Sequence, residues 1–431
     1  MQTKFLLSQI NDPNIKDAND ILRSCVHCGF CNSSCPTYLL MGDELDGPRG
    51  RIYLIKEMLE NDRAASPLDV KHLDRCLGCL SCMTACPSGV NYMHLMEYGR
   101  RHIEQTYRRS FFERLVRILL GVVLPNPKIF KFILGLAVIF RGFEKFLPKN
   151  LRKIAHFVLK LEVKGKVVTP STFMPTSKHK YRVGMLVGCV QNQLYPEINN
   201  ATIRLLNRHG CEVVVIKDVG CCGALNLHLG QREKASKHIK SNIDAWCNEA
   251  ESSKLDAIIV NTSGCGTTVK DYGHLLREDK KYSKKANDIS QLSVDIIEFI
   301  SLIGLRGINI EKKLKVAYQA PCSLQHGQSI RDEPLELLKA CGFEVVVPSH
   351  GDLCCGAAGT YHILQEKISE ELQTKKIKSL VDCSPDIIAS GNVGCMMQLK
   401  MSDTNIVSFP IVHTVELLDW ATGGPKPPSM N

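Results

Sequence analysis

The chain has 431 residues with ample aliphatic content, so we expect a globular protein of two or three domains rather than one core. It carries 20 cysteines and a formal net charge of +10. The charge is concentrated in residues 100–182, which hold 19 Lys or Arg against 4 Asp or Glu, while the rest is slightly acidic. This distribution argues against a nucleic-acid binder and favours one basic segment with a local partner.

The amino terminus turns polar after three apolar residues, which is not the pattern of a signal peptide. We therefore expect a reducing compartment, where clustered cysteines serve as metal ligands more often than as disulfides. The spacing of the cysteines then becomes the main evidence for function.

The first cysteines repeat one spacing twice. Each copy reads C-x2-C-x2-C-x3-C followed by proline, and in such motifs three thiolates hold one cubane while the fourth ligates the other cluster. Zinc is the alternative, but it requires neither the third cysteine nor the proline. The spacing predicts two [4Fe-4S] clusters, one on Cys25, Cys28, Cys31 and Cys86 and the other on Cys35, Cys76, Cys79 and Cys82.

The segment between the two motifs predicts a helix, because Ile52, Ile55 and Leu59 recur at helical spacing after Pro48. We expect residues 1–105 to form an all-α, ferredoxin-like domain that holds both clusters. Two adjacent low-potential centres would conduct electrons rather than catalyse bond chemistry.

Residues 106–180 are predicted to form a basic, apolar, helical connector and a linker. Two apolar runs are separated by Pro125 and Pro127, and the longest uncharged stretch, residues 132–140, is too short to span a bilayer. Two interpretations remain. The helices could pack on the protein's own domains, which is the usual role of an apolar stripe, or they could form a basic amphipathic surface that lies on anionic lipid or a partner subunit.

Residues 181–310 and 311–431 form an internal repeat. In each copy short β-branched runs precede a cysteine, a Cys-Cys-Gly triplet and a last cysteine, and the first cysteine lies 32 positions before the pair. Helical spacing between these runs predicts alternating strands and helices, hence a parallel sheet in each copy. The predicted fold class is α+β and multidomain, with the all-α domain followed by a duplicated α/β cysteine-rich pair.

Because these cysteines follow strands, their thiols are expected at the carboxyl ends of parallel strands, where open α/β folds bind ligands. The pattern predicts a further metal or redox centre, either an iron-sulfur cluster or zinc, on Cys189, Cys221, Cys222, Cys265, Cys322, Cys354, Cys355 and Cys395. The competing interpretation is a tight turn that binds nothing, but a cysteine that only packs has no reason to recur. Gly223 and Gly356 would let the backbone approach a bound group.

Other cysteines and histidines are expected to be structural. Cys211 and Cys341 precede the second strand of each copy, so they should lie in the core at the opposite end of the sheet. The lone histidines near the motifs are expected to be hydrogen-bonded structural residues rather than ligands; they are His228, His326, His362 and His413.

Several stretches resemble the iron-sulfur subunits of bacterial glycolate oxidases, over nearly the whole chain. They are HCGFCNSSCPTYLLMGDELDGPRGRIYLIKEMLE from His27, HLDRCLGCLSCMTACPSGV from His72, GCCGA at Gly220, SGCG at Ser263, APCSLQH at Ala320, LCCGAAGTY at Leu353 and NVGC at Asn392. The stretch DELDGPRGRIYLIK is the most specific part.

The resemblance implies a membrane-associated complex in which separate FAD-binding subunits oxidise glycolate to glyoxylate, with D-lactate as a further substrate. This chain would pass the electrons toward the quinone pool. It would have no catalytic residue and would bind neither substrate nor FAD itself, and no G-x-G-x-x-G loop follows a strand. It would be cytoplasmic and peripheral on the cytoplasmic face of the inner membrane.

Two other functions fit the same motifs. The chain could serve a lactate or glycerol-3-phosphate dehydrogenase, or the repeats could catalyse thiol and disulfide chemistry, since they resemble the cysteine-rich domains of heterodisulfide reductases. In some of those relatives the last motif is C-x2-C. Here GTT follows Cys265 and MMQ follows Cys395. The missing ligand argues against a complete cluster of that type.

Overall fold

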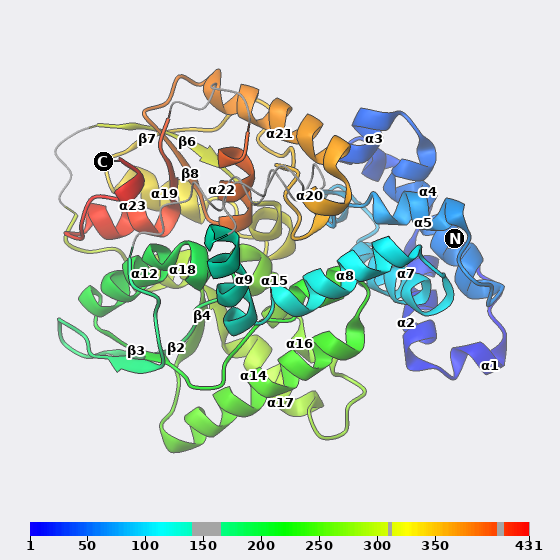
Figure 1. The fold of residues 1–431 in the computed structure, drawn as a ribbon, viewed down its shortest axis with the longest axis horizontal. Coiled ribbons are helices and arrows are strands. Elements are labelled where there is room, and N and C mark those ends of the chain that lie inside the picture. Colours follow the sequence, from blue (N-terminus) through cyan, green and yellow to red (C-terminus); the bar gives the residue numbers. More distant parts are fainter. Residues whose placement is uncertain (140–164, 309–312, 403–408, 431) are drawn as a thin grey trace.

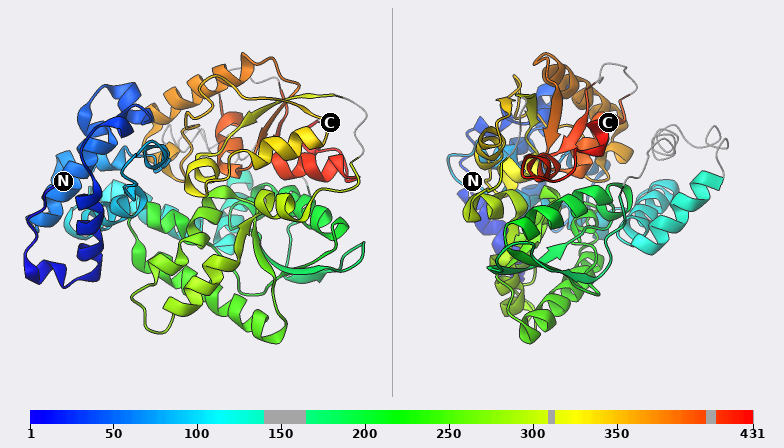
Figure 2. Two further views of the ribbon diagram at one scale, coloured as in Figure 1. Left: turned by 180° about the vertical axis from the view of Figure 1, so that it is seen from behind. Right: turned by 90° about the vertical axis from the view of Figure 1, so that its left-hand side faces the viewer.

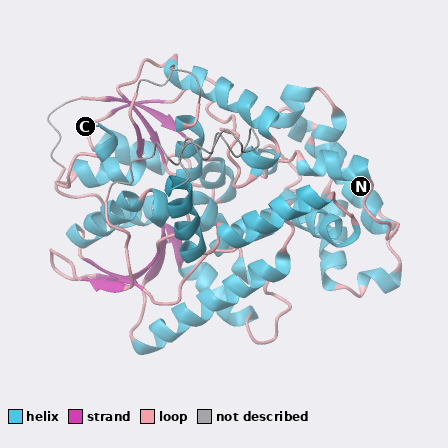
Figure 3. Cartoon of the chain, in the orientation of Figure 1, coloured by secondary structure: helices cyan, strands magenta, loops and turns pink. Residues whose placement is uncertain are grey.

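The computed structural model describes residues 1–139, 165–308, 313–402 and 409–430. An all-helical amino-terminal region lies at one end of the molecule, and two regions that each contain a sheet pack against it and each other (Figures 1 and 3). The helix α8 (Phe111–Val123) runs across the surface between the helical end and the sheets (Figure 1). This arrangement confirms the predicted fold class.

The amino-terminal region consists of helices that flank two cysteine-bearing loops. Its elements are α1 (Leu7–Ile10), α2 (Pro13–Ser24), a 3-10 turn (Phe30–Asn32), α3 (Pro36–Met41), a second 3-10 turn (Glu44–Asp46), α4 (Pro48–Glu60), α5 (Pro67–Asp74), α6 (Ser81–Thr84) and α7 (Tyr92–Thr106). Four of these helices begin with proline. The first N–H groups of a helix have no intrahelical acceptor, so proline, which lacks an N–H, loses no hydrogen bond at this position. The predicted helix between the motifs is α4, and Ile52, Ile55 and Leu59 on it are buried.

Each cysteine-rich repeat contains a sheet whose strands are parallel, apart from β1 among the described residues. The first sheet has the order β1-β3-β2-β4-β5 and the second β7-β6-β8-β9, so both place their second, first, third and fourth parallel strands side by side. This shared order confirms the duplication. The strands are β1 (Ser171–Phe173), β2 (Tyr181–Leu186), β3 (Cys211–Val215), β4 (Ala257–Val260), β5 (Ser293–Asp295), β6 (Lys315–Gln319), β7 (Glu344–Val346), β8 (Ile387–Ser390) and β9 (Ile411–His413).

Helices cover both sheets and join them into one core. Arg204 on α12 donates from Nε to Asp419 Oδ2 on α23 at 2.9 Å, and one apolar cluster contains buried side chains from both sheets. The repeats are therefore packed as one unit. Their helices are α11 (Gln191–Leu194), α12 (Pro196–Arg208), α13 (Ala224–His228), α14 (Arg232–Ser252), α15 (Ser263–Lys270), α16 (Tyr272–Leu275), α17 (Ser283–Leu292), α18 (Ile296–Ile303), a π turn (Ser323–Gly327), α19 (Glu333–Ala340), α20 (Tyr361–Leu364), α21 (Glu366–Val381), α22 (Val393–Lys400), α23 (Thr414–Ala421) and a 3-10 turn (Pro428–Met430).

The predicted connector contains α8 and α9 (Pro127–Ile139), while its residues 140–164 lie outside the described part of the chain. One face of α8 packs on the protein, since Arg117 binds Asp74 at 2.8 Å and Asn226 donates to the Gly121 carbonyl at 3.0 Å. The other face of α8 is exposed, and Figure 2 shows α8 and α9 projecting from the body of the protein. The exposed apolar side chains of these two helices are Phe111, Phe112, Leu115, Ile118, Leu119, Val122, Phe132, Ile133 and Leu136.

Packing on the protein's own domains therefore accounts for one face of α8 only. Within the described ranges, no single helix is both long and apolar enough to cross a bilayer. Helix α8 and the first part of α9 reach that length and composition together, but they meet at a bend of 113°. The end of the predicted linker is also not a simple linker, because β1 pairs there antiparallel to β3. A three-residue edge strand is too short to show a period of two.

Candidate metal centres

The first predicted set of ligands surrounds one small cavity. Cys25, Cys28, Cys31 and Cys86 all line it. Burial, together with the neighbouring Cys25 and Cys86 thiols, raises the pKa of Cys31 to about 11. Thiols that repel each other's charge in this way form a set that bound iron would neutralise. The residues present fit an iron-sulfur cluster.

The second predicted set surrounds a neighbouring cavity lined by Cys35, Cys76, Cys79 and Cys82. Burial raises the pKa of Cys82, and Cys79, Cys76 and Cys35 raise it further. Cys82 lines both cavities, so the two sets adjoin each other. The structure thus brings the last cysteine of each motif into the set formed by the other motif.

The two cysteine loops share an unusual backbone. The second and fourth residues after the first cysteine have positive φ in both loops, at 60° for His27, 86° for Gly29, 64° for Gly78 and 64° for Leu80. A branched residue such as Leu80 rarely adopts this conformation without a functional constraint. Here the turn directs successive thiols toward one point.

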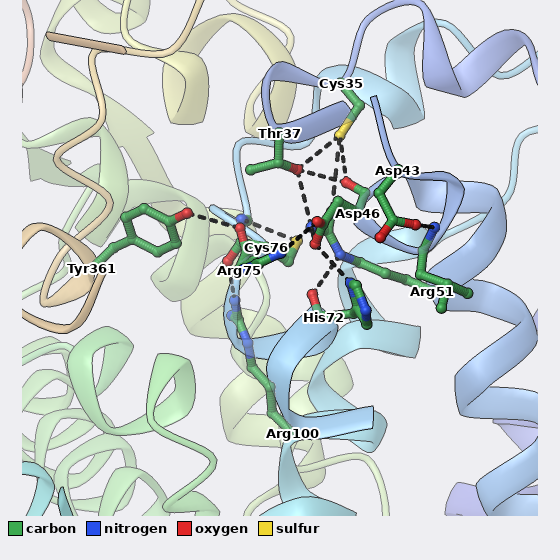
Figure 4. Close-up of polar contacts among 12 residues, drawn as sticks. Cys35, Thr37, Asp43, Asp46, Arg51, His72, Arg75, Cys76, Arg100 and Tyr361 are labelled. Carbon is green, nitrogen blue, oxygen red and sulfur yellow. Dashed lines mark hydrogen bonds and ion pairs between the residues drawn. The ribbon is translucent and has the colours of Figure 1, made fainter. Parts of the chain in front are cut away.

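A buried charged network lies behind the second set, centred on the fully buried carboxylate of Asp46 (Figure 4). Asp46 lies 2.9 Å from His72 Nδ1, accepts from Arg75 at 2.7 Å and lies 3.7 Å from the Arg51 guanidinium. Asp43, Asp46 and His72 also lie close enough together to suggest an ion site. Because two guanidinium groups and a histidine already surround Asp46, we assign it to this network instead.

Arg51 connects the network to the second set of thiols. Its side chain is 1% exposed, and it donates to Thr37 Oγ1 at 2.9 Å and to Cys35 Sγ at 3.8 Å. Although burial opposes ionisation of Cys76, the charges of Arg51 and then Arg100 lower its pKa. Arg51 therefore supplies a buried positive charge beside this set. Sequence reasoning gave Asp46 and Arg51 no role, although both belong to the specific DELDGPRGRIYLIK stretch.

The cysteines of the first repeat gather at the carboxyl end of its sheet. Cys189 Sγ lies 3.7 Å from Cys221 Sγ, Cys221 contacts Cys222, and Cys222 contacts Cys265. The pKa of Cys221 is lowered because Cys189 and Cys222 donate to its sulfur, while the pKa values of these two donors are raised. Cys221 is thus the member of this four-thiol set whose ionisation its neighbours favour.

The second repeat builds an equivalent set. Cys322 contacts Cys354, Cys354 contacts Cys355, and Cys355 Sγ lies 3.2 Å from Cys395 Sγ. Metal–sulfur bonds of about 2.3 Å in a tetrahedral site place two sulfurs about 3.8 Å apart, whereas a disulfide bond is about 2.05 Å. The 3.7 Å separation in the first repeat therefore suits two thiols on one metal, and both separations are too long for a disulfide bond.

Gly223 and Gly356 have φ of 90° and 87°, which favours glycine. A Cβ on Gly356 would lie 2.6 Å from the Ser369 carbonyl oxygen, and one on Gly223 would lie 3.3 Å from the Ala235 carbonyl oxygen. The close approach predicted here is therefore to helices α21 and α14 rather than to a bound group.

Cys211, Cys341 and His413 take the structural roles expected of them. Cys211 and Cys341 are 0% and 1% exposed in the apolar core, and Cys211 begins β3, at the end of the sheet opposite to the thiol set. His413 Nδ1 accepts from the Val415 amide at 3.2 Å and so caps α23.

The second cluster set lies against the second repeat. Cys79 packs in one apolar cluster with Cys322, Cys354 and Tyr361. The pKa of Cys79 is raised by burial and next by Cys322. The first set, the second set and the thiols of the second repeat therefore form a continuous row.

The two repeats meet beside their thiol sets. Ser263 Oγ and Ser323 Oγ are 2.7 Å apart, and Asn392 donates to Ser263 Oγ at 2.8 Å. Each of these residues lies within three positions of a repeat cysteine, so both sets flank this contact. On the other side, His94 on α7 binds Asp271 at 2.8 Å, and its ring stacks on His274 at 3.4 Å.

Comparison with known proteins identifies the family of this chain. Residues 21–90 match a 4Fe-4S dicluster domain, and residues 183–270 and 316–400 match a cysteine-rich domain. The chain is 39% identical over 421 residues to the glycolate oxidase iron-sulfur subunit of Escherichia coli, covering 98% of this chain and 99% of that protein. The chain belongs to the family of glycolate oxidase iron-sulfur subunits.

Two further relatives show how far the similarity extends. The probable glycolate oxidase iron-sulfur subunit of Bacillus subtilis is 31% identical over 426 residues, covering 93% of this chain and 94% of that protein. Lactate utilization protein A of Bacillus velezensis is 26% identical over 245 residues, covering 55% of this chain and 99% of that protein. As a glycolate oxidase iron-sulfur subunit, the chain transfers electrons within an oxidoreductase complex, which implies a flavin-binding partner.

Replacing Cys35 by alanine is expected to lower the iron bound by the second set while the first set stays filled, because Cys35 is the ligand that crosses between the motifs. Iron and acid-labile sulfide per chain, measured after anaerobic reconstitution, test this. Cys247→Ala, a half-buried cysteine on α14, is the matched control and should keep the full iron content. Loss of iron from the first set instead would contradict the crossed assignment.

Replacing Arg51 by methionine is expected to lower the reduction potential of the second centre only, because the buried charge stabilises the added electron. An EPR-monitored redox titration of the full chain resolves the two centres. Arg51→Lys keeps the charge and should restore most of the potential, and the control Arg63→Met removes an arginine that is 37% exposed and lines neither cavity. Equal potentials in Arg51→Met and the unchanged chain would disprove this role.

Proposed function

We propose that this chain is the electron-conducting subunit of a flavin-dependent glycolate dehydrogenase and that it holds two [4Fe-4S] clusters. A partner subunit would bind FAD and oxidise glycolate to glyoxylate, releasing two electrons and two protons. The main support for this proposal is the row of adjoining thiol sets, because an electron that enters at one set could pass to the neighbouring set. The similarity over almost the entire length of the Escherichia coli subunit supports the choice of substrate.

The clusters would supply centres that change oxidation state by one electron each. Two adjoining cubanes match the electron pair that a flavin releases. The chain's own residues hold and insulate these centres: the thiols are packed among Leu77, Tyr92 and Tyr361, which are 7%, 4% and 6% exposed. The buried charge of Arg51 then favours the electron on the second set, which lies next to the second repeat.

We propose that the four-thiol set of each repeat holds a further centre, either an iron-sulfur cluster or zinc. Two observations support this: the sulfur contacts are equivalent in the two copies, and the pKa of Cys221 is lowered by its neighbouring thiols. We expect metal analysis of the full chain to exceed the iron of two cubanes, and Cys355→Ala to remove part of the excess without changing the cubane spectra. A metal content equal to two cubanes alone would rule out the further centres.

We also propose that the exposed face of α8 and α9 rests on the cytoplasmic surface of the inner membrane, from which the quinone pool is reached. Exposed basic residues accompany its apolar side chains, namely Arg108, Arg114, Lys128 and Lys131. A surface that combines apolar groups with lysine and arginine is typical of binding to anionic lipid.

Glycolate is expected to bleach the iron-sulfur absorption of the chain when it is co-purified anaerobically with its flavin-binding partners. D-lactate and glycerol-3-phosphate, added to parallel samples, should act more weakly or not at all. Bleaching only by D-lactate would transfer the protein to a lactate dehydrogenase, toward which the similarity to lactate utilization protein A points. No bleaching by any of the three would refute the conduit.

Leu119→Glu is expected to reduce co-sedimentation with anionic vesicles, because it places a charge in the apolar face of α8. The matched control is Leu302→Glu, since Leu302 is 81% exposed on α18, in the first repeat. Raising the salt concentration should weaken binding of the unchanged chain, whose basic residues are screened. Equal sedimentation of both variants would rule out this face as the membrane contact.

A further inference from the structure

The helices that follow the two Cys-Cys-Gly turns occupy equivalent places in the two repeats. Helices α14 and α21 each begin directly after a glutamine. The glycine turns pack on the same position of both helices, because a Cβ on Gly223 would meet the backbone of Ala235 and one on Gly356 would meet the backbone of Ser369. Ala235 and Ser369 are each the fourth residue of their helix, so the two helices correspond residue by residue.

One buried polar residue differs between these helices. The eleventh residue is Asn242 in α14 and Lys376 in α21, and both are 0% exposed. Each fixes the loop that carries its cysteine pair: Asn242 donates to the Cys221 carbonyl at 2.9 Å, and the Lys376 ammonium group donates to the Gly351 carbonyl at 2.7 Å. Because a neutral amide fixes the loop in the first repeat, the loop of the second repeat does not require a charge.

The ammonium group of Lys376 has no carboxylate partner among the described residues. Its hydrogen bond goes to a backbone carbonyl, and no Asp or Glu of the described ranges lies within 4.0 Å of it. A buried charge is unfavourable unless an opposite charge lies nearby to balance it. The position of Lys376 therefore requires another source of negative charge.

The thiols of the second repeat lie beside this lysine. Leu372, one turn before Lys376 on α21, packs in one apolar cluster with Cys322 and Cys354. Residues four positions apart share a face of a helix, so Lys376 lies on the face that packs against these thiols. The pKa of Cys322 is raised by Cys354 and by burial, and the largest opposing effect is the positive charge of Lys376.

The first repeat has a neutral amide where the second repeat has a cation. The pKa of Cys221 is lowered mainly by Cys189 and Cys222, and His238 on α14 adds a weaker effect. His238 is half-buried, and an imidazole is not a permanent cation. The two four-thiol sets therefore share their sulfur contacts but differ in their electrostatic surroundings.

We propose that Lys376 is the countercharge of an anionic metal centre on the four thiols of the second repeat, and that this repeat binds its metal more tightly than the first. The inference rests on the further centres proposed above. Four thiolates around zinc or around an oxidised cubane carry a net double negative charge, which a buried site must balance. Lys376 balances part of it, whereas Asn242 balances none. Lys376 is not a ligand, because its ammonium group can only donate.

Native mass spectrometry of the full chain, purified anaerobically with its clusters, tests the proposal. The mass added to the chain counts the centres and distinguishes a zinc ion from a cubane. Two backgrounds separate the repeats, because Cys222→Ala should leave the centre of the second repeat and Cys355→Ala that of the first. Each chain is incubated with EDTA, and the loss of the repeat centre is followed with time. The second repeat should lose its metal more slowly.

Lys376→Met is expected to speed this loss about tenfold or more in the Cys222→Ala chain and to change nothing in the Cys355→Ala chain. Lys376→Gln, which keeps a donor, should behave like Lys376→Met, and Lys376→Arg, which keeps the charge, should retain the metal. The matched control is Lys375→Met, which removes the exposed neighbouring lysine and should have no effect. Unchanged loss in both neutral variants would overturn the proposal, as would equally accelerated loss from the first repeat.

Hydrogen–deuterium exchange of α21 distinguishes a countercharge from a lysine that only supports the helix. In the Cys355→Ala chain Lys376 has no anion to balance, so Lys376→Met should maintain or increase the protection of α21. In the Cys222→Ala chain the same substitution should decrease this protection, because it weakens the centre that the helix packs against. Decreased protection in both backgrounds would assign Lys376 to packing alone and would contradict the proposal.

Failure of this inference and failure of the proposed function give different results. A centre that is present in the second repeat but is unaffected by Lys376→Met overturns the inference alone. A mass equal to two cubanes in the unchanged chain rules out the further centres and the inference together. Neither result depends on glycolate or on a flavin-binding partner, so the bleaching experiment tests the conduit separately.

Discussion

The structure depends on the crowding of sulfur atoms at a few points in the fold. Within these sets, neighbouring thiols raise the pKa of Cys31, Cys79 and Cys82, beyond what burial does. Such groupings are unfavourable for ionised thiols alone and become favourable when a metal centre takes up their charge. The strained turn at Leu80 has the same explanation, because the loop must aim several thiols at one point. Metal binding and folding of the amino-terminal region are therefore coupled.

A second constraint makes the two amino-terminal sets unequal. Asp46 fixes Arg51 in the interior, and Arg51 places its charge beside Cys35 and Cys76. A cation near an iron-sulfur centre raises its reduction potential. Electrons would then move from the first set toward the second, which contacts the second repeat through Cys79 and Cys322. The order of the thiol sets in space and the charge of Arg51 would thus lead electrons in one direction.

Much of this arrangement could be predicted from the sequence because it follows local spacing. The cysteine motifs repeat one spacing, helix α4 shows helical periodicity, and the strands before the repeat cysteines are short β-branched runs. What could not be predicted arises between distant segments: Thr84 meets His326 across 242 positions, and Tyr361 binds the Arg75 carbonyl across 286. The role of Arg51 was equally hidden, since a charged residue within a helical pattern normally faces solvent. The exposed face of α8 was ambiguous because its apolar stripe also suits a buried helix.

The EPR spectrum of the fully reduced full chain tests the central claim most directly. Two cubanes in the adjoining cavities that share Cys82 would lie close enough for their unpaired spins to interact. The account predicts a broadened, split spectrum whose coupled part integrates to two spins per chain and loses its splitting in Cys35→Ala. Two independent, unsplit signals, or a chain that binds zinc and stays EPR-silent on reduction, would contradict it.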